Sequence, residues 1–154
     1  MSAKRRGGMK MKKLMEHYYI KEGFAEMDFD AVTRLLAATH WSHGISRAEV
    51  EKASSNSSLV VGIFNEADEQ IGFARLVSDK TRFAYFMDVI ITPELRSSGI
   101  GEQMIQYMLN HPDYTDVYQW MLVTTYAHDF YEKCGFVRTN RAENLMERVL
   151  PRNR

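Results

Sequence analysis

The chain has 154 residues, of which 45% are hydrophobic and 26% charged, and its 20 Lys and Arg residues balance 20 Asp and Glu residues. This length and composition are typical of one soluble domain, and the balanced charge lacks the basic excess of a nucleic-acid-binding protein. The single cysteine cannot form an internal disulfide, which favours a reducing, cytoplasmic setting, and no apolar run reaches the ~18 residues of a membrane span.

The N-terminal residues 1–13 carry six Lys or Arg and no acidic residue. No apolar stretch of the kind found in a secretory signal follows them. We expect a solvated, poorly ordered tail or an artificial extension, with Met9 or Met11 as a native start. Residues 14–154 are then expected to form one domain.

The first half of the chain alternates strand and helix signals. Residues 17–20 are an aromatic run that predicts a strand. Asp28 can cap a helix that ends near His40, and its apolar face consists of Phe29, Val32, Leu35 and Leu36. Ser46 and Glu49 have the spacing of a capping box, which predicts a second helix to about residue 53.

Apolar runs at 59–64, 71–77 and 82–91 are separated by short polar turns. They predict three neighbouring antiparallel strands. A further strand is expected at 120–125, parallel to its neighbour because a helix precedes it. Residues 144–150 alternate in polarity and predict a final strand.

Between the run 89–91 and the following helix the sequence reads RSSGIG, residues 96–101. A glycine-rich turn after a strand and before a helix presents unpaired backbone N–H groups, which suit a phosphate or pyrophosphate. A P-loop would need Lys and Ser or Thr where the chain has Glu102 and Gln103. The dinucleotide fingerprint would need a third glycine at Met104.

The remaining pattern, R-x-x-G-x-G, resembles the acetyl-coenzyme-A loop of the GNAT superfamily of N-acetyltransferases. Residues 127–136, AHDFYEKCGF, are similar to that superfamily's A-x-x-x-Y-x-K-x-G-F segment. The resemblance covers roughly residues 17–150 and is nearest to small bacterial-type members. It implies an α+β fold: a mostly antiparallel twisted sheet of six or seven strands with one splayed parallel pair, flanked by about four helices.

The resemblance also implies transfer of an acetyl group from acetyl-coenzyme A to an amine, by direct attack in a ternary complex and without a metal. The splayed strands would bind the acyl-pantetheine arm through backbone groups, and the loop would bind the pyrophosphate. The residues implied for the cofactor are Val89, Ile90, Ile91, Arg96, Ser97, Ser98, Gly99, Ile100, Gly101, Glu102, Thr124 and Tyr131.

Two residues are candidates for proton transfer. Tyr131 stands where relatives use a phenol to protonate the departing sulfur, although a tyrosine on an amphipathic helix is also a core residue. Asp88 is the nearest carboxylate and is a candidate base or a structural hydrogen-bond acceptor. Regular alternation puts it on the face opposite Val89, so a bulge or a water chain would be required. Tyr85 lies close to where some relatives keep a base glutamate.

The resemblance implies that the acceptor is a small-molecule or peptide amine. In this superfamily the first two helices and their junction commonly wall the acceptor site, so Trp41 and His43, at that junction, are contact candidates. A core tryptophan and an ordinary loop histidine are the alternatives. Because the base glutamate is missing, a catalytically weak acyl-coenzyme-A sensor or partner module is the competing function. We expect a monomer or homodimer without nucleic-acid or membrane partners.

Overall fold

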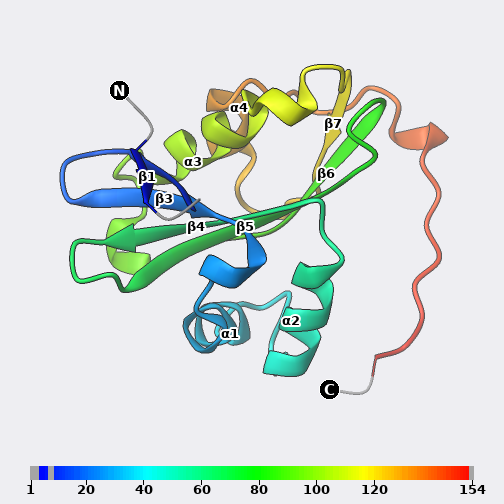
Figure 1. Ribbon diagram of the computed structural model, residues 1–154. Helices are drawn as coiled ribbons and strands as arrows, with labels where there is room; N and C mark the ends of the chain where they lie inside the picture. The colour runs from blue at the N-terminus through cyan, green and yellow to red at the C-terminus, as the bar shows by residue number, and fades with distance from the viewer. Residues whose placement is uncertain (1–3, 7–8, 153–154) are drawn as a thin grey trace.

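The centre of the fold is a sheet of seven strands in a computed structural model that describes residues 4–6 and 9–152 (Figure 1). Helices α1 and α2 cover one face of the sheet, and α3 and α4 cover the other. The strands are β1 (Lys4–Arg6), β2 (Met9–Lys13), β3 (Tyr18–Glu22), β4 (Leu59–Asn65), β5 (Gln70–Ser78), β6 (Phe83–Ile91) and β7 (Gln119–Met121). The helices are α1 (Phe29–Ala37), α2 (Arg47–Ser55), α3 (Ile100–Leu109) and α4 (His128–Lys133).

The order of the strands in the sheet follows their order in the chain. From β2 to β6, each strand pairs antiparallel with the strand before it, and β7 pairs parallel with β6. The intervening α3 provides the crossover that a parallel pair requires. The predicted fold class is confirmed.

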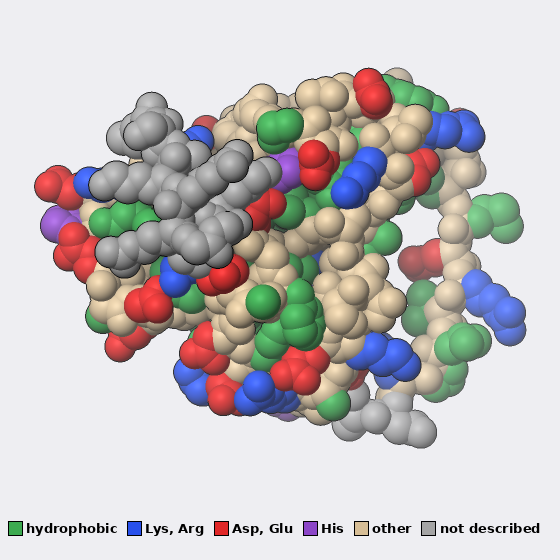
Figure 2. All heavy atoms as spheres, viewed as in Figure 1, with side chains coloured by type: hydrophobic (Ala, Val, Ile, Leu, Met, Phe, Trp, Pro, Cys, Tyr) green, Lys and Arg blue, Asp and Glu red, His purple; other side chains and the backbone are tan. Residues whose placement is uncertain are grey.

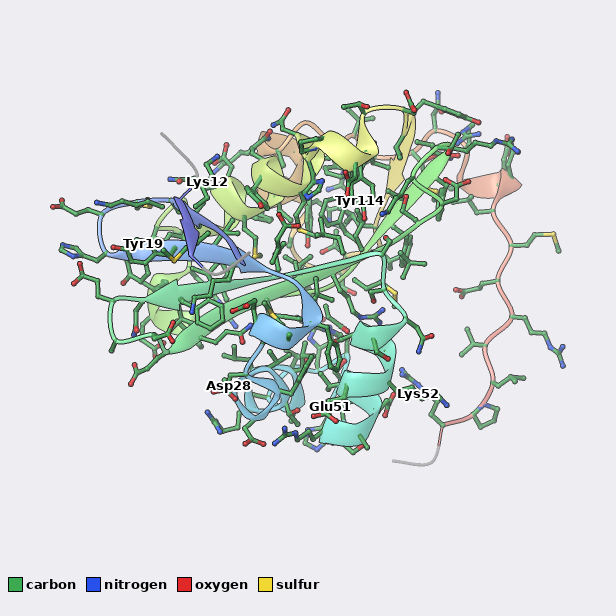
Figure 3. All side chains as sticks on the ribbon, in the orientation of Figure 1. Lys12, Tyr19, Asp28, Glu51, Lys52 and Tyr114 are labelled. Carbon is green, nitrogen blue, oxygen red and sulfur yellow. The ribbon has the colours of Figure 1, made fainter. Side chains whose placement is uncertain are left out.

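Two helices begin at the predicted caps. The carboxylate of Asp28 accepts hydrogen bonds from the backbone N–H groups of Asp30 and Ala31, at 3.1 and 3.2 Å, and Figure 3 labels it at the start of α1. The hydroxyl of Ser46 accepts from the backbone N–H of Glu49 at 3.2 Å. Each such cap contributes about 1 kcal/mol to helix stability.

The sheet separates two hydrophobic cores. The core under α1 and α2 is built around Val32, Leu36, Val60, Phe64 and Phe73. The core under α3 and α4 includes Ile63, Leu76, Phe86, Ile100, Met104, Ile105 and Met108. Because β4, β5 and β6 contribute to both cores, the middle of the sheet is covered on both faces and is rigidly held.

The N-terminal segment differs from the expected tail. Residues 9–13 form β2 and pair with β3, in a register that places Met11 opposite Lys21. Residues 1–3 and 7–8 of the expected tail lie outside the described residues. Within the part that the structure describes, no helix is long and apolar enough to cross a membrane.

The C-terminal quarter differs more. The strand expected at 120–125 ends at Met121, and the final strand predicted at 144–150 is wrong: residues 142–144 form a short 3-10 helix, η4 (Ala142–Asn144), and 145–152 form no strand. Alternating polarity gives a segment the side chains of a strand, but a strand also needs a neighbour for its backbone groups.

Candidate active site

The parallel strands β6 and β7 separate a short way along their length. Their described ladder joins Phe83–Tyr85 with Gln119–Met121, and its last pair is Tyr85 with Met121. Beyond that pair a cavity of about 440 Å³ lies between the strands, within the usual size range of small-molecule sites. Its walls come from β6, from residues 122–127, from α4, from the segment between α1 and α2, and from single residues of α2, β5 and the C-terminal segment: Glu49, Ala53, Arg75 and Arg152.

One wall of this cavity is shaped by a β-bulge at Asp88. Phe73 pairs with Ile90 and Arg75 pairs with Met87, so Asp88 and Val89 together stand opposite one residue of β5. Asp88 takes a positive φ of 54°, a conformation that costs energy in a residue other than glycine. The bulge breaks the regular alternation, and Met87, Asp88 and Val89 all border the cavity.

The carboxylate of Asp88 forms a largely buried ion pair with Arg75. The Arg75 Nε donates to Asp88 Oδ2 at 2.7 Å, and the two side chains are 10% and 13% exposed. A second donor of the guanidinium, Nη1, reaches the hydroxyl of Ser57 at 3.3 Å. The pair both neutralises the buried charges and holds the bulge in place.

Tyr131 borders the cavity from α4. Its ring packs against those of Phe130 and Phe136, with centroids 4.9 and 6.0 Å away. Burial, and to a lesser degree the nearby Cys134 thiol, raises the pKa of Tyr131 to about 12. The phenol therefore keeps its proton at neutral pH and can donate a hydrogen bond into the cavity.

An aromatic cluster closes the opposite side. The ring of His40 lies 5.2 Å from that of Trp41 and 5.4 Å from that of Tyr126, both in edge-on contacts. All three border the cavity, as does Tyr85. His43 is exposed and is not part of this wall.

The glycine loop lies apart from this cavity. Arg96, Ser97, Ser98 and Gly99 are exposed, and the connection from β6 passes through a short 3-10 helix, η2 (Pro93–Leu95). Ser97 and Gly99 take positive φ values of 66° and 88°.

This loop has the features of an anion site. Gly99 occupies the N-cap of α3 without a side-chain cap, and no heavy atom lies within 4 Å of where its Cβ would be. Gly101, by contrast, is buried, and an added Cβ would lie 3.0 Å from Ile91 and 3.2 Å from Phe130. The N–H of Ile100 donates weakly to the Ser98 hydroxyl at 3.4 Å. The open space at Gly99, next to the N–H groups that a helix leaves unpaired in its first turn, fits a phosphate group.

Most predicted site residues are therefore divided between two places. The cavity brings together Tyr85, Asp88, Val89, Thr124, Tyr131 and Trp41. The loop carries Arg96, Ser97, Ser98, Gly99, Ile100, Gly101 and Glu102, while Ile90 is buried in the α1 and α2 core and Ile91 packs against the other. Within the described residues no cluster of three or more His, Cys, Asp or Glu could hold a metal ion.

Three residues at the cavity were missed by the sequence analysis: Arg75, His40 and Tyr126. Arg75 was the most detectable, because an arginine in the middle of the apolar run 71–77 needs a buried partner. The positions of His40 and Tyr126 depend on how α1 and the segment after β7 approach each other, which no local pattern encodes.

The chain matches the model of the acetyltransferase (GNAT) domain over residues 55–138. Among known proteins it is similar to the uncharacterized N-acetyltransferase ycf52 of Pyropia yezoensis, with 28% identity over 97 residues, 58% of this chain and 54% of that protein. A ycf52-like protein of Prochlorococcus marinus is 34% identical over 86 residues, 54% of this chain and 47% of that protein. The chain thus spans about half the length of the curated relatives that it matches.

Solved structures share the architecture. A protein of Xanthomonas campestris pv. campestris, described as belonging to the GNAT family, has a TM-score of 0.80 and 31% identity, covering 89% of this chain and 96% of that one. Glucosamine-6-phosphate N-acetyltransferase of Arabidopsis thaliana has a TM-score of 0.64 and 14% identity, covering 87% of this chain and 99% of that one. The second likeness concerns the fold alone.

Proposed function

Because the chain belongs to the GNAT acetyltransferase family, we propose that it is an N-acetyltransferase that moves an acetyl group from acetyl-coenzyme A to the amine of a small molecule or peptide. One observation carries this proposal: the cavity between the parted strands has a phenol donor, Tyr131, on one wall and a bulged carboxylate, Asp88, on the other. An acyl transfer to an amine needs both a proton donor and a proton acceptor.

The donor would bind along the gap. The described pairing of β6 with β7 ends at Tyr85, so we assign the backbone groups of Val89 and Ile91, beyond that point, to the acyl-pantetheine. The open N-terminus of α3 supports a pyrophosphate at residues 96–102, and the exposed guanidinium of Arg96 can add a charge-assisted hydrogen bond.

The reaction would proceed by direct attack in a ternary complex. The neutral amine nitrogen forms a bond to the thioester carbonyl carbon, and the carbon–sulfur bond breaks. The sulfur leaves with the bonding electron pair, and the attacking nitrogen loses one proton. The site must therefore stabilise negative charge on sulfur and remove a proton from nitrogen.

Tyr131 would act on the sulfur. Its pKa of about 12 lies above the pKa of about 8.5 typical of a thiol, so the phenol is the weaker acid. We expect it to stabilise the departing thiolate mainly by donating a hydrogen bond. A hydrogen bond to a charged group contributes about 1.5–3 kcal/mol, or roughly 10- to 100-fold in rate.

Asp88 would act on the amine. The bulge removes the earlier objection that its side chain should face away from Val89, since both residues border the cavity. The contact with Arg75 uses Oδ2, so Oδ1 is the oxygen assigned to accept the proton, directly or through water.

Thiol release from acetyl-coenzyme A, measured with a panel of amines, tests the proposal. We expect release that depends on one class of amine, and a roughly 10- to 100-fold lower kcat for Tyr131→Phe with nearly unchanged affinity for coenzyme A in calorimetry. Tyr118→Phe is the matched control, because Tyr118 is 70% exposed and does not border the cavity. A loss below threefold for Tyr131→Phe would make this tyrosine a packing residue.

A second function is favoured by the Arg75–Asp88 ion pair itself. The Oδ2 atom of Asp88 already accepts a hydrogen bond from the buried guanidinium, so this carboxylate has a structural role that requires no proton transfer. The chain could then bind acyl-coenzyme A as a sensor or partner module with little turnover. Tight binding in calorimetry without thiol release from any amine in the panel would support this alternative.

A further inference from the structure

The proposed reaction leaves one proton that the site must pass on to solvent. An amine with a pKa of about 10 is an ammonium ion at neutral pH. Its nitrogen therefore loses two protons on the way to an amide, one before it attacks the thioester and one during the attack. The Oδ1 atom of Asp88, which the contact with Arg75 leaves available, holds one proton at a time. Asp88 must release the first proton before it accepts the second.

The way out for this proton runs through the cavity. Asp88 stands in the cavity wall with a side chain that is 13% exposed. The cavity of about 440 Å³ has room for several waters, since one water takes up about 30 Å³, and waters can connect polar groups on different walls. The proton then needs a second side chain that borders the cavity and also reaches bulk water.

His40 has this position. It borders the cavity together with Asp88, yet its side chain is exposed, and its ring is oriented by the edge-on contacts with Trp41 and Tyr126. Figure 2 shows open space between the C-terminal residues 145–152 and the body of the molecule, on the side where α2 and β7 lie in Figure 1. Solvent therefore reaches this side of the molecule.

The turn after α1 holds His40 at the cavity. The backbone N–H and the hydroxyl of Thr39 both donate to the carbonyl of Leu36, at 3.0 and 2.7 Å. The backbone N–H of Ser42 donates to the Thr39 hydroxyl at 3.2 Å. Thr39 and Ser42 are 8% and 5% exposed. His40 thus lies in a turn that is anchored on both sides by buried, hydrogen-bonded residues.

The class of side chain also singles out His40. The other titratable residues at the cavity are Glu49 from α2, Arg75 from β5, Tyr85 and Asp88 from β6, Tyr126, Tyr131 from α4, and Arg152. Guanidinium groups do not give up their proton, and phenols and carboxyl groups as classes titrate far from neutral pH. Imidazole is the side chain that exchanges a proton between pH 5 and 8. Within the described residues neither ring nitrogen of His40 has a hydrogen-bond partner, so one can accept a proton while the other donates one.

We propose that His40 carries the first proton of the acceptor amine from Asp88 to solvent, an inference that rests on the proposed function. The ammonium N–H bond breaks as Oδ1 takes the proton, and the nitrogen keeps its electron pair. Water then passes the proton from Oδ1 to one ring nitrogen of His40, and the other ring nitrogen releases a proton to bulk water. Asp88 is again a carboxylate and accepts the second proton as the carbon–nitrogen bond forms.

Rescue by a dissolved base tests this proton route. His40→Gln keeps a polar side chain but cannot exchange a proton. In weakly buffered solution near neutral pH its kcat should fall by about 100-fold, the low end of the range for a proton-transfer residue. Excess imidazole in solution should restore most of the rate, whereas wild type should respond little. A kcat equal to that of wild type, or a loss that imidazole does not restore, would overturn the proposal.

His43→Gln is the matched control for this experiment. His43 lies three positions away in the same segment, is exposed and does not border the cavity. Its variant should therefore keep the wild-type rate in both solutions.

An NMR titration of the histidine rings gives a readout that requires no turnover. The His40 signal is identified by its absence from the spectrum of His40→Gln. Asp88→Asn removes a negative charge from the cavity wall, so His40 should bind its proton only at a lower pH in this variant, while the titration of His43 should not change. An unchanged titration of His40 would show that the two side chains do not communicate and would contradict the proton route.

The proposed function and the role of His40 fail in different ways. If wild type releases no thiol with any amine, the proposed function is wrong. If wild type releases thiol and His40→Gln does so at the same rate in weak buffer, only the role of His40 is wrong. The NMR comparison decides in both cases whether His40 and Asp88 are coupled.

Discussion

Two buried polar clusters lie on different parts of the sheet. In one, Arg75 and Asp88 form an ion pair at 2.7 Å. In the other, Glu22 accepts a hydrogen bond from the Tyr107 hydroxyl at 2.6 Å and lies 3.0 Å from His111 Nε2. The side chains of the His111–Glu22 pair are 3% and 14% exposed. Both clusters are buried and each contains a carboxylate, so neither property by itself identifies the active site.

The clusters differ in geometry. Both carboxylate oxygens of Glu22 are engaged, and His111 Nδ1 accepts from the backbone N–H of Asp113, which leaves the ring proton on Nε2 for Glu22. Lys12, labelled in Figure 3, lies 5.6 Å above the ring of Tyr107. Asp88 instead has a positive φ and one committed oxygen at a cavity wall. Glu22, Tyr107 and His111 also border a cavity, of about 640 Å³, so the backbone strain at Asp88, and not the opening beside it, distinguishes the two clusters.

The largest effect is expected in the cluster around Glu22. Glu22→Ala leaves the Tyr107 hydroxyl and the His111 ring N–H without their acceptor, which should lower the unfolding free energy by about 3–5 kcal/mol. Urea denaturation measures this loss. Glu66→Ala is the control, because its pair with His17 is about 60% exposed and an exposed ion pair contributes little to stability. If both variants lose the same unfolding free energy, Glu22 does not have the structural role described above.

In the cluster of Arg75 and Asp88, we expect Asp88→Asn to lower the reaction rate more than the unfolding free energy. Asn keeps a carbonyl that accepts from Arg75, but it leaves the buried guanidinium without its counter-charge, so some stability is lost as well and the variant must be shown to fold. If Asp88 is the base, kcat/KM should fall by about 100-fold near neutral pH, and by less at high pH, where the amine loses its proton unaided. Asp116→Asn, at an exposed position, is the control. If the pH–rate profile of Asp88→Asn keeps its acidic limb and the activity stays within a few-fold of wild type, the amine loses its proton to water and not to Asp88.

The smallest effect is in the stability at high pH. Burial raises the pKa of Tyr131 to about 12, above an unfolded value near 10. The folded protein then binds more protons between these values, so stability is full below pH 10 and falls as the pH rises toward 12, by at most about 1.4 kcal/mol per pH unit. Tyr131→Phe should flatten this slope.

Burial and the Glu22 hydrogen bond also raise the pKa of Tyr107. Tyr107→Phe, in the cluster around Glu22, should therefore also reduce the fall of stability with rising pH. Thermal melts between pH 9 and pH 11 measure both changes. If stability still falls with rising pH in the variant that combines Tyr131→Phe and Tyr107→Phe, groups other than these two tyrosines cause the loss of stability at high pH.

Local signals in the sequence predicted much of the fold. The caps at Asp28 and Ser46 depend on residues three positions apart or fewer, and β4, β5 and β6 follow contiguous apolar runs with short turns. The helix after the glycine loop begins at Ile100, as its periodicity predicts. In each case the interaction that decides the structure lies close along the chain.

The site was harder to predict because its main features are non-local. One extra residue does not change the apolar pattern of a strand. The bulge at Asp88 can therefore be recognised only from the pairing of β6 with β5. The partner of Asp88 comes from 13 positions away. The predicted strand at 144–150 failed for a related reason: its pattern is present, but its neighbour is not supplied by adjacent chain.

The order of the strands also bears on synthesis at the ribosome. From β2 to β6, each strand pairs with the one made just before it. We expect the pairs joined by short turns, such as β4 with β5 and β5 with β6, to form as the chain emerges with modest loop-closure entropy, whereas β4 reaches β3 only after α1 and α2 are made. The short β7 is different, because it must wait for α3 and then add in parallel by three residue pairs. Translation through residue 91 would thus yield a nearly complete sheet whose reaction cleft does not yet exist. The cleft arises last, when the final third of the chain arrives.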